Sequence, residues 1–409
     1  MRRFFDTIFA DPAVRFVLMA WLVFRLATTL IAVMVYRVLP FSFAWETQPV
    51  YNLYHEIFTS QGLLRALIDA WYRWDTGWYL FIAHQGYSVN ADAIIYPPLY
   101  PALIRLFAPV FGGDYLLSAI VISSVAAFFA LLLLYKIAAA LCGEPVARWT
   151  ILLFITYPAA FFLMAGYTES LFLACVLGAW WMVMRQRYWL AGILALLAAL
   201  TRSQGWTLAL PFATMIYIAP NLENWGMLTA QLRTTMIALL RPLPAVLGGI
   251  AGTAAYVFGM RLAGFGSVEA QFASAQWKTS LVFPLQSVAE AVASLFDPAH
   301  PFFVSNVFNT LAFVLCVVMG VLMIRRLPLA YPLYVGVTLF FILLRSHADI
   351  ELHGMLRYAV AIFPVFIMMA LLLQGRSRPA RLRRALVLAV GGGLQVIFLA
   401  QFVLWLWVS

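Results

Sequence analysis

The sequence predicts an all-α polytopic membrane protein, a bundle of about 11 transmembrane helices within a range of 10–13. Of its 409 residues, 65% are apolar and only 10% are charged. Soluble proteins carry about 25% charged residues, so this chain has too few charges to cover a surface that faces water. Apolar runs of about 20 residues recur along it, which is the length that a helix needs to cross the hydrocarbon core. The basic residues gather in short segments between these runs, as the positive-inside rule describes.

Eleven of these runs give the expected spans. They lie near 14–38, 115–141, 147–166, 168–184, 188–201, 205–219, 242–262, 302–324, 328–344, 356–373 and 385–407. The segment 94–111 is ambiguous, because it is short, rich in proline at its start and interrupted by Arg105. If it crossed the membrane, the basic segment 374–384 would face outward, against the charge distribution. We therefore expect 94–111 to be a helix embedded at the outer membrane face.

The charge distribution also predicts the orientation. With the N-terminus in the cytoplasm, internal loops and helix ends hold 16 of the 26 basic residues. The external segments and helices then hold 12 of the 16 acids and all five histidines. Residues 39–114 form a long first external loop that carries short interfacial helices, 263–301 form a second external loop, and the C-terminus is external. We expect one transmembrane domain over 1–409, no separate soluble domain and no nucleic-acid partner, since topology accounts for the net charge of +10.

The first external loop contains the clearest candidate for a catalytic residue. It reads WYRWDTGWYLFIAHQGY over residues 71–87. Asp75 lies between Trp74 and Trp78, where the membrane boundary would partly desolvate its carboxylate and make it a stronger base. Two other interpretations stay open. The aromatic residues, Tyr79 among them, can form a belt at the lipid headgroups, and Asp75 can cap the short helix that follows it.

Further polar residues are expected on the same external face, where ionisable groups at membrane depth are functional candidates. They are Asp92 in the first loop, Tyr167 and Glu169 in the turn 166–170, Arg202 at a helix end, and Arg345 and Arg357 in a later loop. The planar fork of arginine suits a phosphate group. The alternatives are local capping or pairing for Glu169 and snorkelling to a lipid headgroup for each arginine. Their convergence on one face predicts that the chemistry takes place there.

The sequence lacks the motifs of several other enzyme classes. It contains no P-loop, no GxGxxG after a strand, no HExxH and no DxD pair that would hold a nucleotide-bound metal. His84 could bind a metal with Asp92 or Glu169, or form a simple hydrogen bond in its loop. Three cysteines lie far apart without metal-ligand spacing, namely Cys142, Cys175 and Cys316. We expect no disulfide, no zinc site and no cofactor, and a reaction that needs no metal.

Five strings carry a resemblance to a known family. They are RWDTGWYLFIAHQGY (73–87), YPPLYP (96–101), YTESL (167–171), ALTRSQG (199–205) and RYAVAIFP (357–364). In this order they resemble the PIG-V family of mannosyltransferases, membrane enzymes of the GT-C glycosyltransferase superfamily, from about residue 15 to 375. The resemblance implies a GT-C-like bundle with Asp75 as the catalytic base. It also implies a polyprenyl-phosphate-linked sugar as donor, which is dolichyl-phosphate mannose in the eukaryotic members.

We therefore expect a hexosyltransferase, a mannosyltransferase by this resemblance, that moves the sugar to a lipid or glycan acceptor with inversion at the anomeric carbon. Asp75 would deprotonate the acceptor hydroxyl, and Arg357 with Arg202 or Arg345 would hold the lipid phosphate. The remaining substrate-binding candidates are Asp92, Glu169, Trp74, Tyr79, His84 and Tyr167. The arginine-rich, short-looped chain looks bacterial. This favours the plasma membrane with an outward-facing site, or the ER membrane if the chain is eukaryotic.

Two other classes of function stay open. A lipid or sugar transporter or flippase is also polytopic and basic inside, but it holds its ionisable residues near the bilayer midplane within inverted repeats. The long, uneven external loop and the acids at the membrane surface disagree with that arrangement. A non-catalytic scaffold that binds lipids is the third class, and the sequence alone does not separate it from an enzyme.

Overall fold

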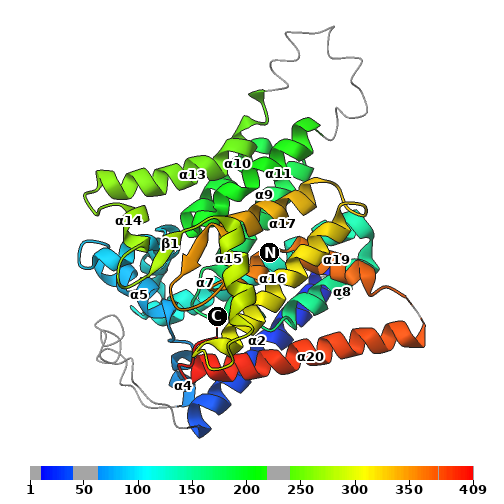
Figure 1. Ribbon diagram of the computed structural model, residues 1–409, viewed down its shortest axis with the longest axis horizontal. Coiled ribbons are helices and arrows are strands. Elements are labelled where there is room, and N and C mark those ends of the chain that lie inside the picture. Colours follow the sequence, from blue (N-terminus) through cyan, green and yellow to red (C-terminus); the bar gives the residue numbers. More distant parts are fainter. Residues whose placement is uncertain (1–10, 40–62, 219–239, 376, 409) are drawn as a thin grey trace. The chain divides into compact units, whose positions relative to one another are not determined.

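The computed structural model describes residues 11–39, 63–218, 240–375 and 377–408. This part of the chain is helical apart from one pair of short strands (Figure 1). It divides into two compact units, each of which is described by itself. Unit 1 comprises Met1–Leu171 and Met369–Ser409, and unit 2 comprises Phe172–Met368.

Unit 1 contains the first helices of the chain and the last. Its α-helices are α2 (Pro12–Val38), α4 (Leu63–Asp69), α5 (Asp75–Gln85), α6 (Leu99–Phe107), α7 (Tyr115–Cys142), α8 (Glu144–Ile155) and α20 (Arg378–Val403). Short 3-10 helices are η1 (Ala91–Ile95), η2 (Ala108–Phe111) and η3 (Ala160–Leu163). Side chains cap the long helices: Asp114 accepts a 2.9 Å hydrogen bond from the Leu117 amide at the start of α7. Helix α2 packs against both α7 and α20, and α6 packs against α5 and α7.

Unit 2 contains most of the remaining helices. They are α10 (Tyr188–Thr201), η4 (Ser203–Leu208), α11 (Ala209–Ala213), η5 (Thr214–Ile218), α13 (Leu243–Leu262), α14 (Val268–Phe272), α15 (Pro284–Ser294), α16 (Phe303–Met323), α17 (Ala330–Leu343), α18 (Met355–Tyr358) and η7 (Ala359–Ala361). Helix α9 (Glu169–Met184) begins in unit 1, whose first part ends at Leu171, and continues in unit 2. Helix α19 (Pro364–Leu372) begins in unit 2 and ends in the second part of unit 1, which starts at Met369. Close packing of α10 on α13 depends on glycine, because a Cβ on Gly248 would lie 2.2 Å from the Gly192 carbonyl oxygen.

The all-α expectation agrees with the structure of the described residues apart from one short pair of strands. Strands β1 (Thr279–Leu281) and β2 (Arg345–His347) form an antiparallel pair in which Leu281 lies opposite Arg345. The pair fastens the loop 263–301 to the loop that follows α17. Each strand has only three residues, which is too short for alternation of apolar and polar side chains to reveal it in the sequence.

Five described helices are long and apolar enough to cross a membrane: α2, α7, α13, α16 and α20. The segments Met355–Ala361 and Pro364–Leu372 would make a sixth span as a pair that bends by 84°. Four shorter apolar helices are Leu99–Phe111, α9, α10 and α17. These helices fit an all-α membrane protein, although they do not establish the expected count of about 11 spans. Residues 40–62 of the expected first external loop lie outside the described residues.

Proline interrupts three of the expected spans. The span expected over 147–166 stops as a helix at Ile155, because Pro158 lacks an amide hydrogen and its ring clashes with the carbonyl four residues earlier. The Gln395 amide of α20 donates to the freed carbonyl groups of Ile155 (3.0 Å) and Tyr157 (2.8 Å). The span expected over 356–373 bends at Pro364. The one expected over 205–219, which contains a proline in α11, divides into 3-10, α and π segments.

Candidate functional site

Asp75 is the first residue of α5, and its carboxylate is half-buried. The Tyr96 hydroxyl donates a 3.1 Å hydrogen bond to its Oδ1 atom. The Asp75 amide donates a 3.2 Å hydrogen bond to the Tyr167 hydroxyl, which itself donates to the Arg73 carbonyl at 3.3 Å. Three separate motifs of the sequence therefore meet at Asp75, one at its carboxylate and one at its backbone amide. This carboxylate retains access to solvent or substrate, as a general base requires.

A cluster of aromatic rings forms the wall beside Asp75. The buried Tyr79 ring meets the rings of Tyr96, Tyr100 and Tyr167 at centroid distances of 5.1, 5.1 and 6.3 Å. Trp78 stacks on Tyr96 at 5.7 Å with 19° between the ring planes. Ring pairs of this kind hold one another in fixed orientations. The Tyr96 hydroxyl is thereby held toward the carboxylate, which the aromatic-belt interpretation of these residues does not explain.

The turn 166–170 is buried against this cluster. The Thr168 hydroxyl lies 3.2 Å from the Tyr79 hydroxyl, and Ser123 of α7 donates a 2.9 Å hydrogen bond to the Tyr167 carbonyl. Gly166 allows the close approach, because a Cβ there would lie 3.0 Å from the Thr76 methyl group of α5. The turn thus brings polar groups of the second motif next to the helix that Asp75 begins.

Glu169 begins α9 with only 5% of its surface exposed. It is close enough to Tyr100 for the two side chains to interact electrostatically. A buried carboxylate is costly unless polar groups surround it. Its place on the Tyr79–Tyr100 side of the cluster keeps the expected role in orienting substrate open for Glu169.

Two residues of the expected set lie farther along the first loop. Asp92 is half-buried on η1, where its amide is capped at 2.8 Å by the Asn90 side chain. His84 is exposed near the far end of α5, nine residues or about 13 Å of helix beyond Asp75. Its ring packs edge-on against Tyr115 at 5.4 Å. His84 is therefore held away from the end of α5 at which Asp75 lies.

Trp74 has a strained backbone immediately before Asp75. Its φ of 49° and ψ of −120° lie in a region that residues with a side chain rarely adopt. Such strain costs about 1–3 kcal/mol and persists only where surrounding contacts enforce it, often at functional sites. The Trp74 ring lies against the rings of Trp405 and Trp407 at 5.6 and 5.2 Å.

Unit 2 holds the three expected arginines, and the guanidinium groups of Arg202 and Arg345 contact aromatic rings. The guanidinium of Arg202, which precedes η4, lies 5.1 Å from the centre of the Tyr358 ring. Arg345 lies between the rings of Phe272 and Phe341, at 4.3 and 4.7 Å. Burial lowers the pKa of Arg345, and the neighbouring Tyr358 opposes that shift. Arg202 and Arg345 therefore both lie close to Tyr358, and Arg357 is the residue before it in α18.

The loop after β2 is held by neighbouring segments of unit 2. Lys278 forms a 2.9 Å ion pair with Asp349, and this contact lowers the pKa of the Asp349 carboxyl group. Asn306 of α16 accepts a 3.1 Å hydrogen bond from the Glu351 amide. The sequence predicts that 263–301 and 345–357 share a face, and within unit 2 the structure brings these two loops together.

Two histidines stack within this loop. The His347 and His353 rings are 4.6 Å apart, with 13° between their planes. Burial, together with the charges of His347 and Arg357, lowers the pKa of His353 to about 3. Burial also lowers the pKa of His347, although Asp349 opposes the shift. His353 is therefore neutral at physiological pH.

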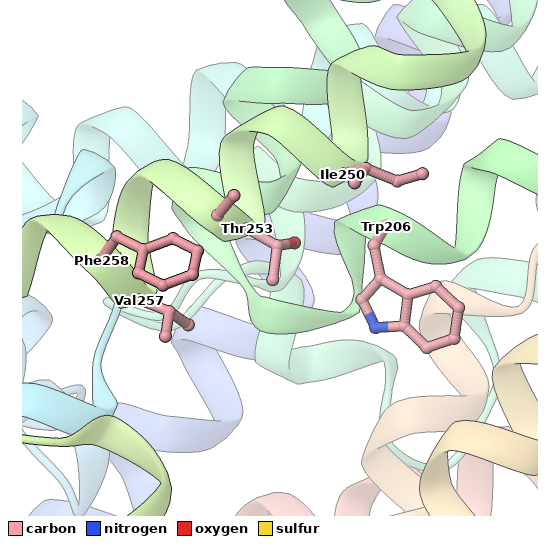
Figure 2. A pocket seen from close by; sticks show the side chains of 6 residues that line it. Trp206, Ile250, Thr253, Val257 and Phe258 are labelled. Carbon is pink, nitrogen blue, oxygen red and sulfur yellow. The ribbon is translucent and has the colours of Figure 1, made fainter.

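An open apolar pocket of about 440 Å³ adjoins η4. Figure 2 shows Trp206 of η4 facing α13, from which Ile250, Thr253, Val257 and Phe258 project. The Trp206 ring also meets the Phe341 ring at 5.7 Å, and Phe341 lies under Arg345. Trp206 of the pocket is therefore linked through the Phe341 ring to Arg345, one of the expected phosphate-binding arginines.

Sequence reasoning missed Tyr96 and Thr168 as site residues, although both lie within the quoted strings. It also missed Arg73 and the two C-terminal tryptophans, whose contacts join distant parts of the chain. Among the described residues, no three His, Cys, Asp or Glu side chains form a group that could hold a metal ion.

Comparison with known proteins gives one matching family, described as mannosyltransferase (PIG-V), over residues 14–243. The chain is 33% identical over 152 residues to GPI alpha-1,6-mannosyltransferase 2 of Rattus norvegicus, an alignment that covers 35% of this chain and 31% of that protein. The same enzyme of Mus musculus is 32% identical over 156 residues, covering 36% and 32%. The matched region thus spans about a third of these relatives. No solved structure matches the chain.

Proposed function

We propose that this chain, which belongs to the mannosyltransferase (PIG-V) family, is a membrane mannosyltransferase with Asp75 as its general base. The observation that carries the proposal is the half-buried Asp75 carboxylate at the start of α5, which accepts a hydrogen bond from Tyr96. Asp75, Tyr96, Tyr167, Glu169 and Arg202 all fall within the residues that match the family.

The proposed reaction is a single displacement at the anomeric carbon of mannose. The acceptor hydroxyl of a lipid or glycan gives its proton to Asp75 while its oxygen forms a bond to the anomeric carbon. The bond from that carbon to the phosphate oxygen breaks, and the polyprenyl phosphate leaves with the electron pair. Attack opposite the leaving group inverts the configuration. A positioned base of this kind contributes about 10²–10⁴-fold in rate.

The donor that we propose is a polyprenyl-phosphate-linked mannose. As the bond breaks, the phosphate gains negative charge, which arginine side chains stabilise. We assign this role to Arg357 together with Arg202 or Arg345, which share the neighbourhood of Tyr358 in unit 2. The apolar pocket beside Trp206 offers a surface for part of an isoprenoid chain. A nucleotide sugar, in contrast, would leave such an apolar surface unused.

The remaining candidates would position the sugar and the acceptor. Glu169 is buried beside the tyrosine cluster and can accept hydrogen bonds from sugar hydroxyl groups, as can Asp92 on η1. We propose that the reaction takes place at the external membrane face, in the plasma membrane of a bacterium, because the positive-inside rule places the basic loops in the cytoplasm and the loops rich in acids outside. The proposed chemistry needs no metal, since a monophosphate carries less charge than a pyrophosphate.

The test offers purified enzyme in lipid matched polyprenyl-phosphate mannose and nucleotide mannose, each with and without a chelator. We expect transfer from the lipid donor in both conditions. Efficient transfer from the nucleotide donor would contradict the proposed donor, and complete loss of transfer with chelator would contradict the metal-free mechanism. Movement of an intact lipid across the bilayer without transfer would favour a flippase instead.

A further inference from the structure

The Arg73 side chain connects the Asp75 loop to the C-terminal end of α20. Only 3% of its surface is exposed. Its Nε atom donates a 2.7 Å hydrogen bond to the Val403 carbonyl, and its Nη1 atom donates to the carbonyls of Asp69 (2.9 Å) and Tyr72 (2.6 Å). Burial lowers the pKa of Arg73 to about 10, so the guanidinium stays charged at neutral pH.

Val403 is the last residue of α20, where the helix leaves carbonyl groups without partners inside it. A cation is favourable at this end of a helix, because the aligned peptide dipoles place partial negative charge there. The Arg73 guanidinium also lies over the ring of Trp405 at 5.2 Å and that of Tyr36 at 5.4 Å. Arg73 thus ties the ends of α2 and α20 to the residues that precede Asp75.

The chain reverses direction just after α20 and returns to Trp74. Trp405 adopts a left-handed backbone with φ of 60°, and the Leu406 amide closes the turn with a 2.9 Å hydrogen bond to the Gln401 carbonyl. Trp405 and Trp407 then contact the Trp74 ring. Two tryptophans with strained backbones, Trp74 and Trp405, therefore pack against each other one residue away from Asp75.

Strained conformations persist only where the surroundings enforce them. At Trp74, enforcement comes from the Arg73 hydrogen bonds before it and from the tryptophan rings beside it. The conformation of Trp74 sets the direction in which α5 begins, because the Thr76 and Gly77 amides donate to the carbonyls of Arg73 (3.1 Å) and Trp74 (2.9 Å). It thereby sets the position of the Asp75 carboxylate.

We propose that the end of α20, Val403–Trp407, acts through Arg73 and Trp74 as a positioning element for Asp75. Arg73 is a positioning residue, while Asp75 is the group that meets the substrate. The proposal rests on the proposed role of Asp75 as the base. It extends the site beyond residues 14–243, the part of the chain that matches the family, to a helix some 330 residues away along the sequence. A displacement of about 1 Å in such a group can cost 10²-fold in rate.

The first test needs no substrate. Hydrogen–deuterium exchange of the full chain in lipid nanodiscs is compared for wild type, Arg73→Lys and Arg73→Met. The control is Arg384→Lys, at the other end of α20. Like Arg73, Arg384 donates a hydrogen bond to a backbone carbonyl (Leu373, 3.2 Å) and lies over a tryptophan ring (Trp149). We expect at least tenfold faster exchange in the peptide over 72–80 for the Arg73 variants and no change there for the control. Unchanged exchange in this peptide would overturn the proposal.

The second test measures mannose transfer per folded molecule. For Arg73→Lys and Trp405→Leu we expect kcat to fall about 10–100-fold while KM for the donor changes less than threefold, with Arg73→Met at least as impaired as Arg73→Lys. The double variant Arg73→Lys/Trp405→Leu should lose much less than the product of the single losses, since both changes release one element. A loss of folded protein with unchanged kcat would mean that Arg73 is merely a structural anchor.

If wild type transfers no sugar, the proposed function fails. The exchange measurement then still decides whether the end of α20 orders the Asp75 loop.

Discussion

The Tyr96 hydroxyl donates a 3.1 Å hydrogen bond to the carboxylate of Asp75, which lies 21 residues earlier in the chain. Tyr96 is held in place by the stacked Trp78 ring and by a 2.7 Å hydrogen bond from the Tyr87 hydroxyl to its carbonyl. The bond holds the Oδ1 atom of Asp75. Because the carboxylate is planar, this contact also orients its second oxygen. In the proposed reaction, Tyr96 would therefore orient the base.

Asp75→Asn should abolish transfer, with a loss of about 10²–10⁴-fold in rate, because an amide cannot accept the proton of the acceptor hydroxyl. Expression and thermal stability should stay close to wild type, since the amide keeps the shape of the side chain and can still accept the Tyr96 hydrogen bond. Initial rates with polyprenyl-phosphate mannose check this. Retention of a third of wild-type turnover would show that Asp75 is not the base.

Tyr96→Phe should lower kcat by about three- to tenfold, a loss within the range of one hydrogen bond, because the base loses its orienting partner. Tyr334→Phe is the matched control. The buried Tyr334 hydroxyl, in unit 2, also donates one hydrogen bond, to the Ala361 carbonyl at 3.1 Å. The two variants are compared at saturating donor and acceptor. Equal losses in both would mean that Tyr96 acts only through stability.

Arg357→Gln should raise KM for the lipid donor and also lower kcat, because the phosphate gains charge as it leaves. Arg357→Lys should restore activity only in part, since an ammonium lacks the planar fork of a guanidinium. The control is Arg261→Gln, a half-exposed arginine of unit 2 that pairs with Glu269 at 3.0 Å. An effect of Arg357→Gln no larger than that of the control would remove Arg357 from the phosphate site.

The buried His353 predicts a loss of stability in acid. Its pKa is about 3 when folded, below the ordinary value of 6.5, so the unfolded chain binds one more proton between these values. Stability should therefore fall as the pH drops from 6.5 toward 3, by up to about 1.4 kcal/mol per pH unit from this residue. His353→Gln should reduce the difference in Tm between pH 7 and pH 4.5. His84→Gln, at an exposed position, is the control and should leave that difference in Tm unchanged. An equal response of both variants would show that His353 is not the source of the loss of stability in acid.

The topology can be tested by labelling single cysteines in intact cells, after Cys142, Cys175 and Cys316 have been replaced. A membrane-impermeant maleimide should label Ser60→Cys, which lies outside the described residues in the expected external loop. It should not label Ser377→Cys, at the N-cap of α20. The opposite labelling pattern would reverse the orientation and place the proposed reaction at the cytoplasmic face.

The membrane class and the family could be read from the sequence, because both are written in local patterns. Apolar runs predict α2, α7 and α13 to within two residues at either end. The string around Asp75 pointed to the residue that we propose as the base without any knowledge of its surroundings. Local patterns did not reveal where spans break, because the consequence of Pro158 depends on whether a distant side chain can take up the freed carbonyl groups. Gln395, 238 residues from Tyr157, does so.

The partners of Asp75 were decided only by the tertiary structure. Nothing in the neighbourhood of Arg73 in the sequence points to Val403, since a buried guanidinium and a helix end form a favourable pair only when folding excludes water from both. Likewise, the aromatic residues at 405 and 407 have the composition of an interfacial belt, whereas in the structure their rings contact Trp74. The order of residues states which chemical groups the protein has. Their distances depend on contacts between distant segments, which no local pattern encodes.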